Sequence, residues 1–544
     1  MKGLLTSLIT VLTFTGLQAQ TVPSVPKLVV GLTIDQLRTD YIEAFSSLYG
    51  EKGFKRLWKE GRVYQNAEFN FTNIDKASSV AAIYTGTPPG INGIIAQDWI
   101  DRVSTRPVNC VEDKSFMGIY TDETTSASAL LTSTIADELK VATQGNALVY
   151  AIAPYREAAI LAAGHAGNGA FWMNDETGKW CGTTYYADFP YWVTRYNDQK
   201  GLDFRIGDMT WTPHHPVEMY RFLKSEWPQE GFKYHFDDQK KSKYRKLKTS
   251  PYINDEVNLL ATECLYSCPM GEDETPDMLS LTYYAGNYDH KTAMEAALEM
   301  QDTYVRLDKS IADLLDVIDK KVGLHNTVFF ITSTGYTDGD APDLNKYRIP
   351  TGEFHTNRCA ALLNMYLMAI YGQGQYVEAH HGLQIYLNQK LIEDKQLSLP
   401  EVISKSADFL IQFSGVNEVY TSYRLLLGAW TPEVYRIRNS YNRKRSGDLL
   451  IDVLPGWTIV QENPANNKLV RKSYIPAPLI FLGGNVKPEI IQTPVNVDCI
   501  APTLAHFMRI RAPNACQTAP LFLIYLILAC LYESFLIPFA VIFS

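Results

Sequence analysis

An aspartate, Asp35, follows a short apolar run and could serve as a metal ligand or as an acid beside a bound ligand. The run KLVVGLT (Lys27 to Thr33) has the composition of a buried parallel strand. Open α/β sheets bind ligands at the carboxyl edge of such strands, where Asp35 would lie. The alternative is that Asp35 ends the strand only because its side chain favours a turn.

Two pairs of adjacent histidines, His214–His215 and His380–His381, could also bind a metal. Neither pair has carboxylates at the spacing of a metal site, so we interpret both as surface residues. The sequence has no Gly-rich phosphate loop, no set of kinase motifs and no nucleophile elbow.

Further apolar, β-rich runs would position these residues within a sheet. They are separated by helical patterns, of which Ala293 to Val317 is the clearest. This alternation predicts an α/β fold, with a mainly parallel central sheet and helices on both faces. The additional runs are Ala147 to Ala153, Met278 to Tyr284, Thr327 to Thr332 and Pro478 to Leu482.

Two regions, residues 180–256 and 342–466, interrupt this alternation. The first is rich in Tyr, Trp, Lys and Asp and has little periodicity. The second contains a stretch that we interpret as helical, Gln375 to Asp394, and a β-rich stretch, Leu449 to Val460. We expect both regions to be insertions that form a cap or auxiliary lobe over the sheet.

The composition is that of an ordinary globular protein, with 46% hydrophobic and 20% charged residues among 544. The net charge of -9 gives no basic surface. Nucleic-acid binding usually needs a face rich in Lys and Arg, so we exclude that class of function.

The N-terminus predicts export to the periplasm or cell envelope. Residues 1–20 combine Lys2, an apolar stretch and small residues near Ala19, as in a secretory signal peptide. Export would place the eight cysteines in an oxidising compartment where they could pair. Cys264 and Cys268, four residues apart, could lie on adjacent helical turns, but no set of cysteines has the spacing of a zinc site.

The C-terminal stretch, residues 522–544, is hydrophobic and long enough to span a bilayer. It contains Glu533, whose charge is costly at membrane depth, and Pro538. Around Leu531 to Ser534 it resembles a transmembrane helix of RND-type efflux transporters. We therefore keep two interpretations open, a membrane anchor and a gene-joining artefact.

Several segments between residues 25 and 521 resemble the alkaline phosphatase superfamily, in the branch of type I phosphodiesterases, nucleotide pyrophosphatases and secreted bacterial alkaline phosphatases. Five segments occur in the family's order, which makes chance agreement improbable. They are VVGLTIDQLRTDY (Val29 to Tyr41), IYTGTPPGINGI (Ile83 to Ile94), ILAAGHAGNGAFW (Ile160 to Trp172), TPDMLSLTYY (Thr275 to Tyr284) and VDCIAPTLAHFM (Val497 to Met508).

The resemblance implies a site with two zinc ions, held by three aspartates and three histidines, and a Thr or Ser nucleophile at a helix N-terminus. Asp35 matches the first metal ligand. The nucleophile falls on Lys76, with Ser78 and Ser79 as neighbouring alternatives, and a phosphoryl-contacting Asn falls on Gln97. The remaining family positions are replaced: the basic pair by Tyr155 and Glu157, and four metal ligands and a final histidine by Asn287, Lys291, Thr334, Gly335 and Pro476.

Displaced donors lie near some of these positions, namely Asp289, His290 and Asp338. One carboxylate cannot hold a pair of dications, because affinity and geometry need several converging donors. We therefore predict an exported, catalytically inactive or impaired member that binds no cofactor. We also expect Lys76 to pair with Asp35 in place of a metal's charge.

The alternative is an active, zinc-dependent phosphomonoesterase or phosphodiesterase, with Asp35 as a ligand and Ser78 or Ser79 as the nucleophile. For the inactive member, the expected partner is a phosphorylated small molecule or an envelope protein. Membrane contact is expected only if the tail is a natural anchor.

Overall fold

The computed structural model describes residues 24–521, except 187–188, 223–230, 238–241, 293–294, 338–347, 429–430, 461–467, 472–474 and 485. The predicted signal peptide, the C-terminal tail and Asp338 therefore lie outside the described residues. Within the described part of the chain, none of the helices combines the length and the hydrophobicity that a membrane span requires.

One large sheet organises the chain, in the strand order β21-β2-β20-β12-β1-β11-β6-β7-β8-β5, with β22 beside β2. Its centre is parallel, since β1 pairs in parallel with both β11 and β12, and β6 joins β11 and β7 in the same sense. The strands are β1 (Leu28–Asp35), β2 (Arg62–Glu68), β5 (Gly118–Ile119), β6 (Val149–Ala153), β7 (Gly169–Met173), β8 (Trp180–Thr183), β11 (Asp277–Tyr284), β12 (Thr327–Ser333), β20 (Ala477–Leu482), β21 (Glu489–Ile491) and β22 (Val495–Asn496).

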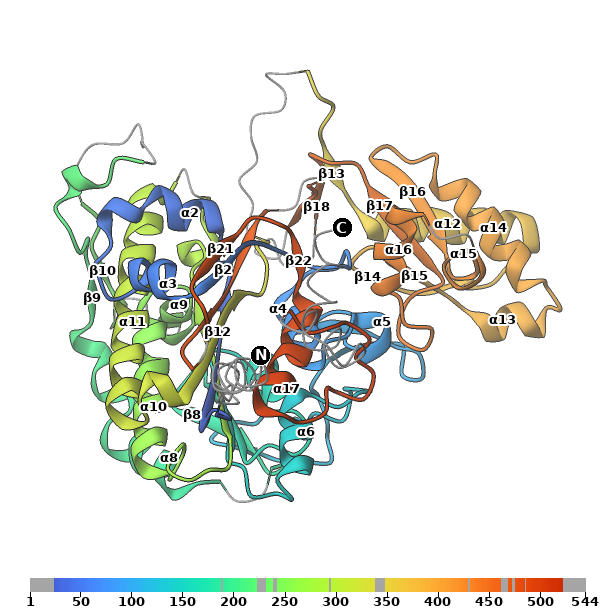
Figure 1. Ribbon diagram of the computed structural model, residues 1–544. Helices are drawn as coiled ribbons and strands as arrows, with labels where there is room; N and C mark the ends of the chain where they lie inside the picture. Colours follow the sequence, from blue (N-terminus) through green and yellow to red (C-terminus); the bar gives the residue numbers. More distant parts are fainter. Residues whose placement is uncertain are drawn as a thin grey trace, which may run out of the picture.

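Helices cover both faces of this sheet, which confirms the predicted fold class (Figure 1). One face packs against α2 (Thr39–Ala44), α3 (Phe54–Glu60), α8 (Tyr191–Gln199), α9 (Lys243–Lys248), α10 (Tyr252–Ser267) and α11 (Ala297–Lys321). The other packs against α4 (Lys76–Thr85), α6 (Ile135–Ala142), α7 (Arg156–Ala163) and α17 (Ile500–Met508), and α5 (Pro89–Asn92) lies against α4.

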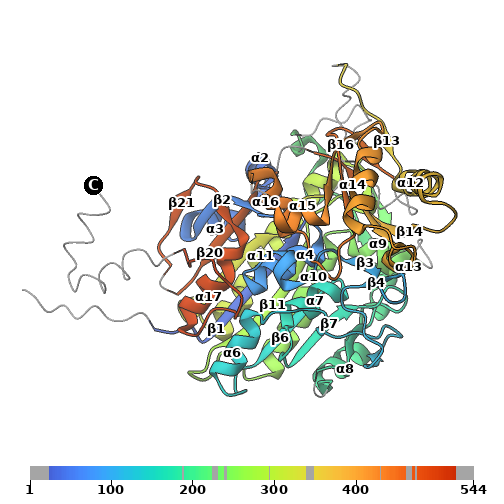
Figure 2. The same ribbon diagram turned by 90° about the vertical axis from the view of Figure 1, so that its right-hand side faces the viewer.

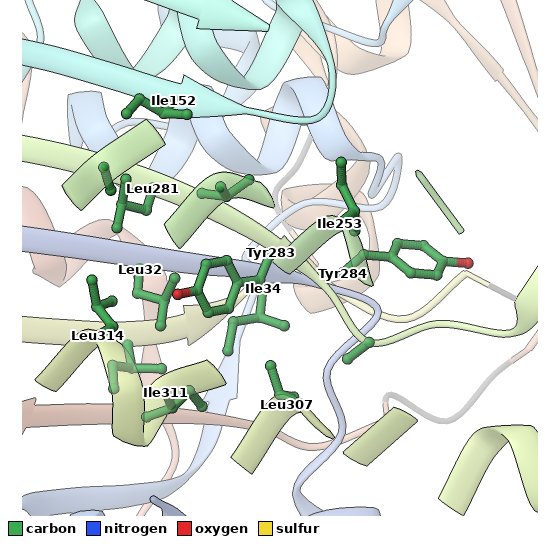
Figure 3. Packing of buried hydrophobic residues seen from close by; sticks show 14 of the residues in the cluster. Leu32, Ile34, Ile152, Ile253, Leu281, Tyr283, Tyr284, Leu307, Ile311 and Leu314 are labelled. Carbon is green, nitrogen blue, oxygen red and sulfur yellow. The ribbon is translucent and has the colours of Figure 1, made fainter. Parts of the chain in front are cut away.

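Side chains of β1 point alternately into the two hydrophobic cores, one on each face of the sheet. Leu32 and Ile34 point to the α11 side, where Figure 3 shows them near Ile311 and Leu314. Val29, at an odd position, packs on the α4 side. Because successive side chains of a strand alternate between faces, a continuous apolar run is what a strand buried on both faces requires.

A second sheet forms a lobe beside the main sheet, drawn in orange in Figure 1, with the order β14-β15-β17-β16 and its own hydrophobic core. Its elements are α12 (Thr356–Tyr371), β14 (Val377–His381), β15 (Gln384–Leu387), α13 (Gln389–Asp394), α14 (Leu399–Leu410), β16 (Val416–Thr421), α15 (Ser422–Leu427), α16 (Pro432–Asn439) and β17 (Leu449–Val453). Smaller pairings involve β3 (Asp98–Asp101), β4 (Arg106–Asn109), β9 (Thr210–Trp211), β10 (Tyr234–His235), β13 (Glu353–Phe354), β18 (Thr458–Ile459) and β19 (Lys468–Leu469).

The helix predicted over Gln375 to Asp394 is wrong for most of its length. Residues Val377–His381 and Gln384–Leu387 form an antiparallel hairpin, and only Gln389–Asp394 is helical. The reason is Gly382, which has a φ of 55° and makes the turn between the two strands. The β-rich stretch predicted over Leu449 to Val460 is confirmed by β17 and β18.

Candidate functional site

The candidate site lies where the carboxyl ends of β1, β11 and β12 meet the N-terminus of α4. A cavity there has an empty volume of about 270 Å³, which includes its opening to solvent. Seven of its lining residues carry polar groups on their side chains: Asp35, Lys76, Tyr155, Thr282, Tyr283, Tyr284 and Thr334. The fold thus brings the predicted metal-ligand, nucleophile and basic-pair positions together at the expected edge of the sheet.

Two neutral neighbours donate hydrogen bonds to the carboxylate of Asp35. The Thr334 hydroxyl donates to its Oδ1 at 2.7 Å, and the Gln36 amide nitrogen approaches the same oxygen at 3.4 Å. Two hydrogen bonds to Thr337 fix the Gln36 side chain. Its Nε2 donates to the Thr337 hydroxyl at 2.9 Å, and its Oε1 accepts from the Thr337 backbone N–H at 2.7 Å. Thr334 stands at a family metal-ligand position, and here its hydroxyl satisfies the acid that a metal would otherwise bind.

The ammonium of Lys76 stacks on the ring of Tyr155, with Nζ 3.6 Å from the ring centroid. Burial alone would lower the pKa of Lys76, but Tyr155, Glu157, Asp35 and Asp75 outweigh burial and raise that pKa. Burial raises the pKa of Tyr155 to about 12, so its phenol stays neutral at physiological pH. The side chain at the nucleophile position is therefore a charged ammonium held against an aromatic ring.

The direct pairing that the sequence suggested for Lys76 and Asp35 stays a prediction. Among the ion pairs of the described residues, none within 4.0 Å joins them, although both line the cavity. Asp35 still raises the pKa of Lys76 through space. Lys76 occupies the first position of α4, where a cation opposes the helix dipole, so nearby acids have to stabilise it.

Glu157 is the buried acid of this site, with 4% of its surface exposed. The amides of Gln97 and Asn109 donate to its Oε1 at 3.2 Å and 2.9 Å, and Arg156 lies 3.5 Å from the same atom. Burial opposes ionisation, but Lys76 and Arg156 outweigh it and lower the pKa of Glu157. A carboxylate thus occupies a position where the family resemblance implies a phosphoryl-binding cation.

A second lysine, Lys248 of α9, approaches the same aromatic ring, with Nζ 4.9 Å from the Tyr155 centroid. It donates to the Met173 carbonyl and to Asp175. Burial lowers the pKa of Lys248 despite Asp175. Nothing in the sequence distinguishes Lys248 from the other lysines of its basic run, because α9 reaches the site only through the tertiary fold.

Ser78 and Ser79, the alternative nucleophiles, are both fully buried inside α4. The Ser78 hydroxyl accepts from the Asp75 backbone N–H at 3.1 Å and donates to the Asn73 carbonyl at 2.9 Å. With Asp75 bonded to the Ser78 backbone, this completes a capping box. The Ser79 hydroxyl has no partner in the part of the chain that the structure describes.

These contacts predict opposite effects for two neighbouring substitutions. Ser78→Ala removes the N3 half of the capping box, leaves the Asp75 cap in place, and should lower the free energy of unfolding by about 1 kcal/mol. Ser79→Ala removes an unsatisfied buried hydroxyl and should be neutral or slightly stabilising. Chemical denaturation of both variants measures the difference, and an equal loss in both would contradict the capping role.

Two of the displaced donors, Asp289 and His290, form no metal-binding group with Asp35 among the described residues. The Asp289 carboxylate pairs with Lys246 at 3.0 Å, and its neighbour His290 is exposed. Lys291 donates to the Tyr234 hydroxyl at 3.3 Å. Asn287 is buried after β11, and Asp338 lies outside the described residues.

Two other substituted family positions, Gly335 and Pro476, have structural roles in the backbone. Gly335 has a φ of 94°, and a Cβ atom there would lie 2.5 Å from the Ile74 side chain. The Pro476 carbonyl accepts a hydrogen bond from the Thr39 N–H at 3.0 Å, so this residue contributes a backbone hydrogen bond. A histidine at position 335 would meet both a strained backbone and a steric conflict.

Neither histidine pair belongs to a metal-binding group among the described residues. His380 and His381 are consecutive on β14, so their side chains leave opposite faces of the strand. The His215 ring nitrogen Nε2 lies 3.1 Å from the Leu48 carbonyl. Within the described ranges, no group of three or more His, Cys, Asp or Glu residues is placed to hold a metal ion.

Among the described residues, which leave out the loop 338–347, the donors around Asp35 do not fit a pair of zinc ions. Zinc in proteins takes nitrogen, sulfur and carboxylate donors, usually three or four for each ion. The side chains that line the cavity with Asp35 are hydroxyls, phenols and an ammonium, and the ammonium would repel a dication.

Comparisons with known proteins agree with this architecture. The family model for type I phosphodiesterase / nucleotide pyrophosphatase matches residues 29–474. The chain is 29% identical over 522 residues to alkaline phosphatase PafA of Elizabethkingia meningoseptica, covering 91% of this chain and 94% of the relative. It is also 29% identical to alkaline phosphatase PhoV of Synechococcus elongatus, with the same coverage.

A solved structure of a similar protein extends the agreement to three dimensions. The crystal structure of wild-type alkaline phosphatase PafA superposes with a TM-score of 0.82 at 27% identity, covering 92% of this chain and 99% of that one. A relative from Myroides odoratus named as a calcium-transporting ATPase is 30% identical over 515 residues, covering 90% of this chain and 93% of the relative.

Proposed function

The chain belongs to the type I phosphodiesterase / nucleotide pyrophosphatase family, and we propose that it is an exported member that does not hydrolyse phosphate esters. In this proposal the protein keeps the family's fold as a binding protein of the cell envelope. Its ligand is a phosphorylated small molecule or an envelope protein.

The observation that carries the proposal is the Lys76 ammonium, which lies 3.6 Å from the Tyr155 ring at the nucleophile position. An ammonium whose pKa is raised has no lone pair to attack phosphorus at physiological pH. Its positive charge also lies in the cavity that Asp35 lines, where it takes over the charge compensation that a metal would supply.

The electrostatics on the far side of Tyr155 support the same conclusion. Transfer of a phosphoryl group needs cations around its oxygens, and Glu157 supplies a carboxylate instead. Gln97 directs its amide N–H to Glu157 at 3.2 Å, so that group is already engaged. A phosphoryl group held for transfer at this position would meet a buried carboxylate, which opposes catalysis, whereas the Lys76 side of the cavity offers a cation to the phosphate of a bound ligand.

The active alternative would use Ser78 or Ser79 as the nucleophile and Asp35 as a metal ligand. Ser78 is engaged in the capping box, and Ser79 is completely buried. To reach a substrate, the Ser78 or Ser79 hydroxyl would have to become exposed, which would require the first two turns of α4 to unfold.

Metal content and hydrolysis together test the proposal. We expect the purified full chain to hold well under one tightly bound zinc and to show no chelator-sensitive hydrolysis of p-nitrophenyl phosphate. About two zinc ions per chain, with hydrolysis abolished by chelation, would overturn it.

Asp35→Asn is the matched control for that experiment. It preserves the shape of the side chain and removes the carboxylate that an active site would need. Any trace hydrolysis that is equal in the original chain and in Asp35→Asn comes from a contaminant, whereas a large loss in the variant would support the active alternative.

A further inference from the structure

Three sulfur atoms come together at the carboxyl end of helix α10. They belong to Cys264, Cys268 and Met270, which are all buried. The Cys264 thiol is hydrogen-bonded to Cys268, and its sulfur lies 3.8 Å from the Met270 sulfur. None of the three residues lines the cavity at Asp35, so the cluster is separate from the candidate site.

The end of the helix and the turn after it bring the three sulfurs together. Cys268 follows the last residue of α10, and its backbone N–H donates to the Cys264 carbonyl at 2.9 Å. The two cysteines therefore lie on the same side of the helix, one turn apart. Gly271, with a φ of 70°, reverses the chain, and the Asp277 carboxylate accepts its N–H at 2.8 Å. This turn packs Met270 back against Cys264.

The cluster lies at the opposite edge of the sheet from the candidate site. Figure 2 shows α10 beside β6 and β11, the two strands it packs on. Strand β11 begins with Asp277 near the cluster and ends with Tyr284, which lines the cavity. At about 3.3 Å per residue, this strand separates the two sites by about 23 Å. An inference about the cluster therefore does not depend on the proposed function.

We propose that Cys264, Cys268 and Met270 bind one soft monovalent metal ion, copper(I), for which silver(I) is a chemical substitute. Thiolate and thioether sulfurs select such ions, whereas harder ions prefer oxygen donors. With metal–sulfur bonds of about 2.3 Å, two sulfurs on one ion lie about 3.8–4.0 Å apart at tetrahedral or trigonal angles. The distance between the Cys264 and Met270 sulfurs, 3.8 Å, already has this value.

The neighbouring polar groups do not add a hard ligand. Both oxygens of Asp277 are engaged by backbone N–H groups, of Leu148 at 2.7 Å and of Gly271 at 2.8 Å. Across the described ranges, no other Cys, His, Asp or Glu completes a metal-binding group with the two thiols. Zinc would thus find two of the three or four donors it usually takes, whereas copper(I) finds a set made only of sulfur.

Two buried donors face the Cys268 sulfur, the Tyr150 hydroxyl and the Trp192 indole N–H. Their rings meet edge to face, with centroids 6.0 Å apart. In the part of the chain that the structure describes, the Trp192 N–H makes no regular hydrogen bond, although the side chain is only 7% exposed. Outer donors of this kind orient a metal-bound thiolate and offset its negative charge.

Binding at this cluster is an exchange of protons for a metal ion. The two thiols release their protons to solvent, the thioether has no proton to lose, and the ion stays monovalent, so no oxidant or reductant is needed. Ser267 and Pro269, on either side of Cys268, are exposed. The cluster therefore lies just below the surface, and an ion can reach it without unfolding of α10.

Competition for copper(I) tests the proposal. The reduced full chain, kept free of oxygen, should remove about one copper(I) per chain from its coloured bicinchoninate complex. Met270→Leu keeps the volume and apolar character of the side chain and removes the thioether, so the copper(I) affinity should fall about tenfold or more. Cys268→Ser should abolish the uptake. Cys359→Ser is the matched control, since Cys359 is a buried cysteine in the core of the lobe.

Thermal unfolding midpoints of the metal-free variants separate a lost ligand from a damaged fold. Loss of uptake in Cys268→Ser and Met270→Leu at unchanged midpoints, with only sulfur neighbours in copper X-ray absorption of the original chain, would support the site. A reduced chain that takes up no copper(I) would overturn the proposal and leave the three sulfurs to packing or to a disulfide. Equal uptake by Cys268→Ser and Cys359→Ser would overturn it as well.

Discussion

Replacing Lys76 with methionine should lower the free energy of unfolding by about 2–3 kcal/mol near neutral pH. The substitution keeps the length and apolar stem of the side chain but removes the cation that faces Glu157 and Asp35. Glu157 would then be a buried carboxylate with Arg156 as its remaining cation. Denaturant unfolding at a series of pH values measures the effect.

The pH dependence follows from the direction of each pKa. The pKa of Glu157 is lowered in the folded protein, so its ionised form stabilises the fold above its unfolded pKa, and that stability is lost as the pH falls through the folded pKa. The pKa of Lys76 is raised, so its contribution is lost only at high pH, as the pH rises through the folded pKa. We therefore expect the penalty of Lys76→Met to shrink as the pH is lowered toward the acid range.

The double variant Lys76→Met/Glu157→Gln separates charge from packing. If charge dominates, adding Glu157→Gln to Lys76→Met should recover about 1–2 kcal/mol, because the unpaired carboxylate is gone. A penalty for Lys76→Met that is the same at acid and neutral pH, with no recovery in the double variant, would show that the lysine stem acts only by packing against Tyr155.

The sheet was predictable because its central strands are buried on both faces. The runs at Lys27 to Thr33 and Met278 to Tyr284 contain few polar residues, so their burial could be inferred locally. The direction of a strand could not be inferred, because an apolar run has the same composition in a parallel and in an antiparallel strand. Strand β20 is in fact antiparallel to β12. The hairpin at Gly382 was missed because a single turn glycine outweighed the helical spacing around it.

The candidate site was predictable only as a set of positions. The family register placed Lys76, Tyr155 and Thr334 near Asp35, and the cavity brings them together. The partners of these residues come from distant segments that no local pattern connects. Asn109, which donates to Glu157, and Lys248, which faces Tyr155, arise from the folding of β4 and α9 against the sheet.

Replacing Asp302 with alanine should have the largest effect on stability, a loss of about 3–5 kcal/mol. The carboxylate is completely buried in α11. It accepts from the Trp211 indole, the His214 backbone N–H and the Tyr220 hydroxyl at 2.6 Å each, and from Arg306 at 2.7 Å. Alanine would leave these donors buried without an acceptor, and each unsatisfied donor costs about 1–3 kcal/mol.

The loss of stability should also be local, because Asp302 links the segment around Trp211 and Tyr220 to α11 by hydrogen bonds. We expect Asp302→Ala to lower the thermal unfolding midpoint and to expose this segment to limited proteolysis before the rest of the chain. Asp316→Ala is the matched control on the same helix, since it breaks only the exposed 3.0 Å ion pair with Lys52 and should change stability by less than about 1 kcal/mol. Similar midpoints for both variants, with no new cleavage near Trp211, would show that the segment is held by its aromatic packing and that the carboxylate network is dispensable.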